Sequence, residues 1–270
     1  MNLTMKADLH IHSNWSDGSM SIPGIVKTAK ALSLAAISIT DHDTMAGWAE
    51  AKEAGGKQGL HMIPGIEVSA FDPDTGRKVH ILGYGIADHG AMETACRPYL
   101  EDRRRANLEA LALIRAAGYP VDEDDVLAYA GKSGIPYRQH IMHALADRGF
   151  TSAIYGPLYT KLFGPGGMAV VKSAYINAEE AVRLIVDCGG AAVLAHPFMY
   201  DSLGLLPRLT ERGLTGIECR HHTQTPERET LVREAARRHN LFLTGGSDFH
   251  GLYSGKPIIL GAFSFQPVCL

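Results

Sequence analysis

Along most of the chain, short apolar segments alternate with amphipathic ones, and polar residues cluster where the apolar segments end. The apolar segments predict buried strands, and the amphipathic ones predict helices. Repeated strand–helix units predict parallel strands with helices outside, as a barrel or a doubly wound sheet. The polar strand ends favour the barrel, because barrel enzymes build their sites there. We expect strands at 6–12, 35–42, 61–70, 77–86, 191–197, 214–220, 241–250 and 257–263, and helices at 22–33, 44–57, 178–188, 203–212 and 226–239.

The alternation is interrupted once. Between residues 90 and 165 one helical pattern follows another, and the sequence predicts no strand there. We therefore predict an α/β fold, an irregular barrel made of residues 1–89 and 166–270, with residues 90–165 inserted as a helical segment that contributes to the substrate pocket. A length of 270 residues suits one core domain that carries such an insertion.

Composition and charge exclude several classes of function. No apolar run approaches the roughly 18 residues of a membrane span, and the first residues lack a secretion-signal pattern, so we expect a cytoplasmic protein. A net charge of -3 argues against an extended nucleic-acid surface, so a nucleic-acid substrate would be short or bound locally. Four widely spaced cysteines predict reduced thiols and no thiolate metal site. The sequence leaves the oligomeric state open.

Two histidines, His10 and His12, stand two positions apart in the first predicted strand. Side chains at i and i+2 of a strand share a face, so both imidazoles project to one side and can chelate a metal ion. Two buried structural histidines would give the same pattern. Asp8 lies on the same face, and we expect it to hydrogen-bond one of these imidazoles.

This histidine pair is not isolated, because six predicted strand ends carry histidine or an acidic residue. Glu67 interrupts an otherwise apolar pattern, and a buried carboxylate needs a cation or a strong partner. Asp248 and His250 repeat the i, i+2 spacing. So many coincidences favour a metal centre over structural histidines. The candidate metal ligands are His10, His12, Asp17, His42, Glu67, His80, His196, Asp248 and His250.

Nine candidate ligands are too many for one ion. Imidazole and carboxylate ligands without thiolate favour Mn, Fe, Zn, Co or Ni over calcium or magnesium. Two ions about 3.5–4 Å apart, bridged by a carboxylate and a hydroxide, suit in-line displacement at phosphorus. We predict two or three divalent transition metals, manganese first with iron or zinc as alternatives, and the bridging hydroxide as the nucleophile.

Taken together, the motifs DLHIHS, SDG, ITDHDT, IPGIEVS, VHILGY, VLAHP and GSDFH resemble those of the polymerase and histidinol phosphatase (PHP) family of phosphoesterases. They run in the family's order from residue 8 to residue 250. The resemblance implies a distorted (βα)7 barrel with three metal sites. The first site would use His10, His12, Glu67 and Asp248; the second Glu67, His80 and His196; and the third Asp17, His42 and His250.

The segment YRQHIMHAL resembles the Arg-x-His helix start of the stand-alone nucleotide phosphatases of this family. The resemblance implies that Arg138 and His140 contact the phosphate, and an arginine at a helix start suits that task. The residues alone favour an ordinary surface or helix-capping pair, and the resemblance reverses this preference. His222 is a candidate for contacting the phosphate or leaving group, or is a loop histidine. Glu218 either orients a neighbour or pairs with an arginine. The run Arg103–Arg105 predicts a solvated helix face without a role.

These observations predict a metal-dependent phosphoesterase acting on a small phosphorylated substrate. The subgroup resemblance implies a nucleoside 3′,5′-bisphosphate or the 5′ end of a short RNA. Residues 150–175 depart from the nucleotide-phosphatase pattern, so a cyclic phosphodiester of a sugar is the alternative. A non-catalytic, metal-stabilised binding domain is the alternative from another class. It is disfavoured because all nine ligand positions hold a suitable residue.

Overall fold

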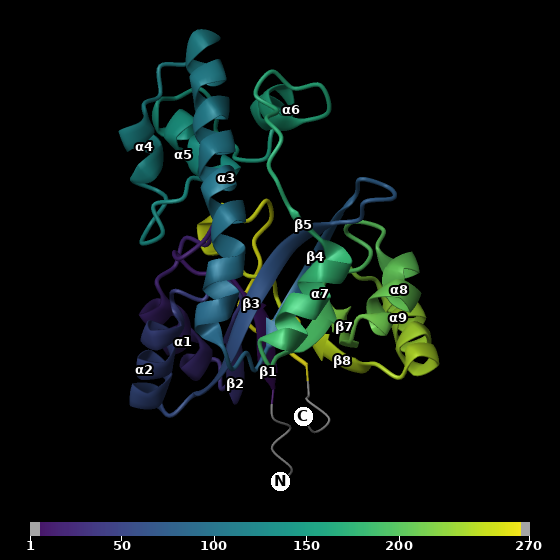
Figure 1. The fold of residues 1–270 in the computed structure, drawn as a ribbon. Coiled ribbons are helices and arrows are strands. Elements are labelled where there is room, and N and C mark those ends of the chain that lie inside the picture. The colour runs from purple at the N-terminus through teal and green to yellow at the C-terminus, as the bar shows by residue number, and fades with distance from the viewer. Residues whose placement is uncertain (1–5, 266–270) are drawn as a thin grey trace.

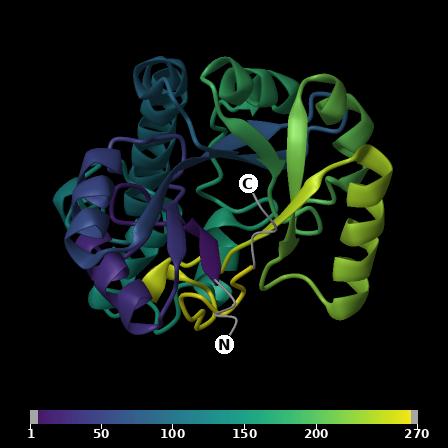
Figure 2. The same cartoon turned by 90° about the horizontal axis from the view of Figure 1, so that it is seen from below.

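A computed structural model describes residues 6–265, in which eight strands form one curled sheet with helices outside it (Figures 1 and 2). The continuous order is β1-β2-β3-β4-β6-β7-β8, and the short β5 pairs with β3. The sheet curves until β1 returns to the segment after β8, where the His12 amide donates to the Phe249 carbonyl at 2.9 Å. The strands are β1 (Ala7–Ile11), β2 (Ala36–Ile39), β3 (His61–Phe71), β4 (Lys78–Tyr84), β5 (Ile176–Asn177), β6 (Ala191–Leu194), β7 (Leu214–Arg220) and β8 (Phe242–Gly245).

The sheet is a distorted barrel of mixed direction. β4 runs antiparallel to both neighbours, β3 and β6, whereas the other paired strands run parallel. The antiparallel pair arises because β3 and β4 are joined by a tight turn, closed by the Asp72 amide donating to the Arg77 carbonyl at 2.9 Å. A helical crossover would have been needed to make them parallel.

The strand predicted at 257–263 is wrong. These residues form turns, and the segment meets the sheet only beyond them, through a bridge between Ala7 and Phe265. Gly261 has a positive φ of 80°, which breaks an extended run. Its amide donates to the Asp8 carboxylate at 2.7 Å rather than to a neighbouring strand.

Helices surround the sheet, and those between β4 and β5 rise above it as a helical segment, α3 to α6 (Figure 1). α3 belongs to two cores: Met92 and Cys96 pack beneath the barrel helices, whereas Leu111 and Ile114 pack with α5 and α6. The division at residue 90 therefore stays a prediction. The α-helices are α1 (Ile22–Ala31), α2 (Trp48–Gln58), α3 (His89–Ala116), α4 (Glu123–Leu127), α5 (Arg138–Asp147), α6 (Pro157–Phe163), α7 (Ala178–Asp187), α8 (Leu206–Glu211) and α9 (Pro226–His239).

Two further expectations concern the whole chain. Across residues 6–265, no helix is both long and apolar enough to cross a membrane. Cys96, Cys188 and Cys219 are free and buried, as expected of reduced thiols, while Cys269 lies outside the described residues.

Candidate metal centre

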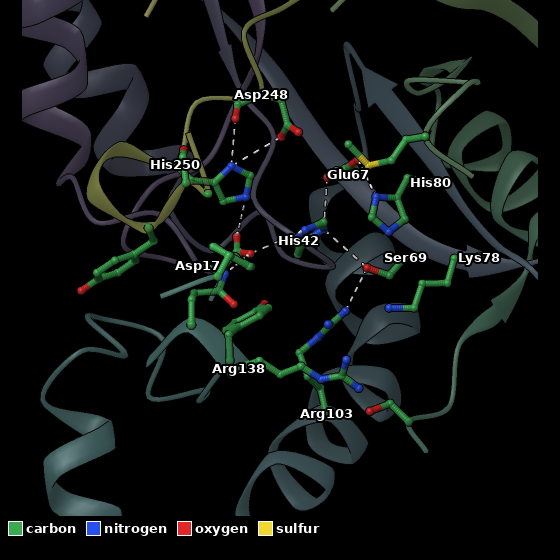
Figure 3. Close-up of a pocket in the computed structure, with 18 of the residues that line it drawn as sticks. Asp17, His42, Glu67, Ser69, Lys78, His80, Arg103, Arg138, Asp248 and His250 are labelled. Carbon is green, nitrogen blue, oxygen red and sulfur yellow. Dashed lines mark hydrogen bonds and ion pairs between the residues drawn. The ribbon is translucent and has the colours of Figure 1, made fainter. Parts of the chain in front are cut away.

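The structure brings all nine candidate ligands to one end of the sheet, beside a cavity of about 870 Å³ between the barrel and the helical segment. His10 and His12 lie beneath the cavity floor and have no exposed surface. The other seven line the cavity: Asp17, His42, Glu67, His80, His196, Asp248 and His250. Figure 3 shows Asp248 and His250 on one side of this cavity, with Glu67 and His80 beside them.

Glu67 is the centre of the cluster. It lies within β3, is 1% exposed, and faces five imidazoles. Burial alone would raise the pKa of this carboxyl, but His80, His10 and His42 hold it well below its usual range. Its Oε1 lies 2.8 Å from His80 Nδ1, 2.9 Å from His196 Nε2 and 3.4 Å from His10 Nε2. Its Oε2 lies 3.1 Å from His42 Nδ1 and 3.2 Å from His12 Nε2.

Two aspartates flank this centre. Asp248 Oδ1 lies 3.2 Å from His12 Nε2 and 3.5 Å from His10 Nε2. Asp17 Oδ1 lies 3.3 Å from His250 Nε2 and 3.5 Å from His12 Nδ1. His12 therefore faces both aspartates, one with each ring nitrogen. Asp248 also has a positive φ of 53°, a backbone conformation that is costly for residues other than glycine and recurs at functional sites.

These residues fit divalent cations. Among the described residues, His10 Nε2 and both ring nitrogens of His12 are buried without a hydrogen-bond partner, which is costly unless something else binds them. Two atoms that each bind one ion at about 2.1 Å lie roughly 3–3.5 Å apart, and the spacings around Glu67 and the two aspartates match this. In the part of the chain that the structure describes, four groups of ligand atoms converge here: His12, Asp17, His42 and His250; His10, His12 and Glu67; His42, Glu67 and His80; and His221, His222 and Asp248. The assignment of ligands to individual ions stays a prediction.

Glu218 at the end of β7 orients two of the histidines. Its Oε1 lies 3.0 Å from His10 Nδ1, and its Oε2 accepts the His196 backbone amide at 2.8 Å. A proton on His10 Nδ1 leaves Nε2 free to face the cluster. The corresponding expectation for Asp8 is wrong. The Asp8 carboxylate accepts the amide and hydroxyl of Ser247 and the amide of Gly261, so it ties backbone segments together and contacts no imidazole ring.

The three predicted substrate residues lie in different places. Arg138 begins α5 and lines the cavity, with its guanidinium 5.2 Å from the centre of the Phe163 ring. His222 also lines the cavity, and burial lowers its pKa to about 4. His140 does not reach the cavity: it is fully buried, and its Nδ1 accepts the Tyr137 amide at 3.1 Å. The structure gives His140 a helix-capping contact, and the phosphate contact that the resemblance implies stays a prediction.

Sequence reasoning missed Arg103. The middle of α3 carries its guanidinium into the cavity wall, where Nη2 donates to Asp43 Oδ2 at 2.5 Å and to Ser69 Oγ at 2.9 Å (Figure 3). The expectation of a solvated arginine run holds for Arg104 and Arg105, which pair with acidic residues at the surface, but is wrong for Arg103. One signal was present in the sequence: Asp43 follows a buried strand and needs a nearby cation.

Two further cavity residues had no sequence signal. Lys78 begins β4 and points into the cavity, and Gln139 follows Arg138 in the first turn of α5 (Figure 3 labels Lys78). A lysine at a strand start and a glutamine in a helix are ordinary surface residues by pattern. Docking of the helical segment against the barrel brings Gln139 to the metal cluster, whereas Lys78 reaches the cavity from β4 of the barrel itself.

Comparisons with known proteins agree with this geometry. A family model described as the PHP domain matches residues 8–123. The chain is also 42% identical over 254 residues to the phosphoribosyl 1,2-cyclic phosphate 1,2-diphosphodiesterase of Eggerthella lenta, a match that covers 94% of this chain and 97% of that protein. This chain belongs to the PHP family.

Other members of the PHP family match over similar lengths. The 3′,5′-nucleoside bisphosphate phosphatase of Chromobacterium violaceum is 32% identical over 97% of this chain and 93% of that protein. A solved structure described as a metal-dependent phosphoesterase of Bifidobacterium adolescentis superposes with a TM-score of 0.86 at 30% identity, over 95% of this chain and 91% of that one. The chain is accordingly a metal-dependent phosphoric ester hydrolase with the α/β fold of this family. The non-catalytic alternative is set aside.

Proposed function

We propose that this PHP phosphoesterase hydrolyses a small ribose phosphate that carries a second phosphoryl group, and that a cyclic phosphodiester of phosphoribose is its preferred substrate. The observation that carries the proposal is a pair of cations in the cavity wall. Among the described residues, Lys78 and Arg138 have no acidic partner within salt-bridge distance, whereas Arg103 between them is neutralised by Asp43. Figure 3 shows all three on the side of the cavity that faces Asp248 and His250.

The choice of a cyclic ester follows from the relatives. The sequence identity to the cyclic phosphodiesterase of E. lenta is 42%, and that to the bisphosphate phosphatase of C. violaceum is 32%. Both matches span nearly the whole chain. Nucleoside 3′,5′-bisphosphates remain the second candidate. They are favoured by the tyrosines that line the cavity, which offer ring faces for stacking a base: Tyr137, Tyr155, Tyr159, Tyr175, Tyr200 and Tyr253.

The nine candidate ligands would hold two or three divalent transition metals, manganese first. When bound, the metals would lower the pKa of the attacking water and offset negative charge that builds on the phosphoryl oxygens. Water adds to phosphorus, one P–O ester bond breaks, and the departing oxygen takes up a proton, so a cyclic diester opens to a monoester. The chain itself supplies orientation through Glu218, which fixes the ring of His10, and through Asp248 and Asp17, which face His12.

The cavity cations would bind the second phosphoryl group. Arg138 offers a planar fork that can donate two parallel hydrogen bonds to phosphoryl oxygens, and Lys78 adds a point charge. Arg103 donates to Asp43 and Ser69, so it forms part of the cavity wall between Arg138 and Lys78 and is not assigned to the phosphoryl group. The neutral ring of His222 can orient the sugar or the reacting phosphate by hydrogen bonding.

A substrate panel with Mn²⁺ tests this function, with turnover followed by ³¹P NMR. The panel pairs ribose 1,2-cyclic phosphate 5-phosphate with the same cyclic ester lacking the 5-phosphate, and adenosine 3′,5′-bisphosphate with AMP. We expect the highest kcat/KM for the phosphorylated cyclic ester. We also expect a loss of at least about 100-fold without the second phosphoryl group, since two charge-assisted contacts disappear.

Two results would contradict the proposal. Faster turnover of the bisphosphate would make the chain a nucleotide phosphatase. Equal turnover with and without the second phosphoryl group would show that Lys78 and Arg138 do not select the substrate.

A further inference from the structure

Asp17 belongs to a short loop, residues 13–18, that leaves β1 and passes over the metal cluster. The loop is tied to the barrel by Asp41, whose carboxylate accepts the Ser13 amide at 2.7 Å and the Ser16 hydroxyl at 2.6 Å. These contacts fix the start of the loop. They leave the Asp17 carboxylate itself, 5% exposed, to be fixed by its own partners.

One of those partners comes from the helical segment. The Gln139 side-chain amide, 7% exposed, donates from Nε2 to Asp17 Oδ2 at 2.6 Å. A carboxylate can only accept, so the NH₂ group of Gln139 must face it. Asp17 Oδ2 accepts this hydrogen bond and lies 3.8 Å from His42 Nε2, while Oδ1 lies 3.3 Å from His250 Nε2 and 3.5 Å from His12 Nδ1. The contact therefore fixes the rotation of a carboxylate that faces histidines with both of its oxygens.

We propose that Gln139 is a positioning residue for Asp17, and that docking of the helical segment thereby completes the metal site formed by Asp17, His42 and His250. The inference rests on the metal-binding part of the proposed function. Hydrogen bonds to a ligating carboxylate fix its orientation, and losing such a partner typically weakens metal binding by about 10–100-fold. Removal of the Gln139 amide should therefore weaken one metal equivalent and leave the others unchanged.

The position of Gln139 gives this contact a wider effect. Arg138, the preceding residue, lines the cavity where the second phosphoryl group would bind. One helix start therefore holds the substrate with one side chain and a metal ligand with the next. Any shift of α5 would move both together.

The chain offers a matched control for docking in general. Lys132 also joins the helical segment to the barrel, because its Nζ donates to Glu50 Oε2 at 2.7 Å and its backbone amide donates to the Asn14 carbonyl at 3.0 Å. Its side chain does not contact Asp17. The ammonium also lies 5.5 Å from the centre of the Trp15 ring, in the loop that carries Asp17. Lys132→Met therefore removes one contact to α2 and one to this loop, while the hydrogen bond from Gln139 to Asp17 stays in place.

The experiment is a Mn²⁺ titration of metal-depleted protein, with free Mn²⁺ followed by EPR. Asp17→Asn identifies the equivalent that belongs to this site. Gln139→Met keeps the length of the side chain but removes the donor, and we expect the same equivalent to bind about 10–100-fold more weakly. Gln139→Asn keeps the amide on a shorter stem and should weaken it less. If Gln139→Met does not fold, the Mn²⁺ affinity of Gln139→Asn is compared with that of wild type instead. Lys132→Met should titrate as wild type.

Three results would overturn the inference. If Asp17→Asn loses an equivalent but Gln139→Met titrates as wild type, Gln139 does not position the ligand, while the metal assignment stands. If Lys132→Met weakens the same equivalent as much as Gln139→Met, the effect arises from docking alone. If Asp17→Asn titrates as wild type, the assignment of Asp17 to a metal fails, and the proposed function loses one of its sites.

Discussion

The cavity has two walls that are built in different ways. The barrel wall consists of the metal-ligand candidates, which extend from strands or from loops beside them and are held by the sheet; the Asp43 amide, for example, donates to the Glu67 carbonyl at 3.0 Å. The helical wall consists of Arg103, Arg138 and Gln139, which reach in from α3 and α5. Their positions depend on the separate core of the helical segment. The comparison teaches that the candidate metal ligands and Lys78 are placed by the barrel, whereas the positions of Arg138, Arg103 and Gln139 depend on helix docking.

The largest effect should come from the barrel wall. Glu67→Gln keeps the size of the side chain but removes the charge that faces five imidazoles. We expect loss of at least one metal equivalent and a fall in kcat of at least about a thousandfold, in the range for a lost electrostatic element at a reacting centre. Elemental analysis and steady-state kinetics measure both. Full metal content with activity within tenfold of wild type would contradict the central role of Glu67.

A smaller effect should follow in the helical wall. Arg138→Ala should leave the metal content intact, because arginine has no acceptor for a cation. The loss should appear mainly in kcat/KM, at about 2–4 kcal/mol for a charge-assisted contact to the substrate. Arg138→Lys should recover little, since it lacks the planar fork. Near wild-type kcat/KM for the Ala variant, measured on the best substrate, would place the phosphate contact elsewhere, with His222 next to be tested.

Arg103 links the two walls, and its loss should appear as instability. Arg103→Met removes the cation from Asp43, which is only 1% exposed, and leaves that carboxylate without its charged partner. We expect a loss of about 2 kcal/mol in the free energy of unfolding, less than for a fully enclosed pair because the cavity admits water. Urea unfolding of the metal-free protein measures it. Asp43→Asn in the same background should recover part of the loss, and no recovery would separate the effect from the ion pair.

The smallest effect is expected one residue further along α3. Arg104 pairs with Glu123 at 2.9 Å on the surface of the helical segment. Exposed pairs contribute about 0–1 kcal/mol, so Arg104→Met should change stability by less than about 1 kcal/mol and leave kcat/KM unchanged. An effect equal to that of Arg103→Met, in the same unfolding measurement, would mean that the arginine run acts as a whole and that the two walls are not distinct.

The same contrast explains what the sequence could predict. His10 and His12 share a side because neighbouring side chains of an extended chain alternate, a rule that needs no knowledge of the rest of the fold. Asp248 and His250 come together for another reason: β8 ends at Gly245, and Asp248 has a positive φ, so the predicted strand at 241–250 is too long and its alternation does not place them. Arg103 and its neighbour Arg104 look identical in sequence, and only the rotation of α3 against the barrel decides which one enters the cavity. The missing strand at 257–263 has a similar cause. The apolar run at 257–263 predicts a strand, but the Gly261 amide donates to the Asp8 carboxylate and therefore cannot pair with a neighbouring strand.

The seam between β1 and the segment after β8 also governs the order in which the molecule can assemble. The Asp248 amide donates to the His10 carbonyl at 2.9 Å, and the Ser247 hydroxyl donates to Asp8 at 2.6 Å, across nearly the whole length of the chain. Contacts between residues so far apart in sequence form late, because a long loop must close before they can be made. During synthesis, the full set of candidate metal ligands therefore cannot assemble before the last of them, His250, has been added to the chain. His10 and His12 can meet Glu67 earlier, but Asp248 and His250 join them only after residues 247–250 have left the ribosome. A chain that ends before these residues lacks two of the nine candidate ligands.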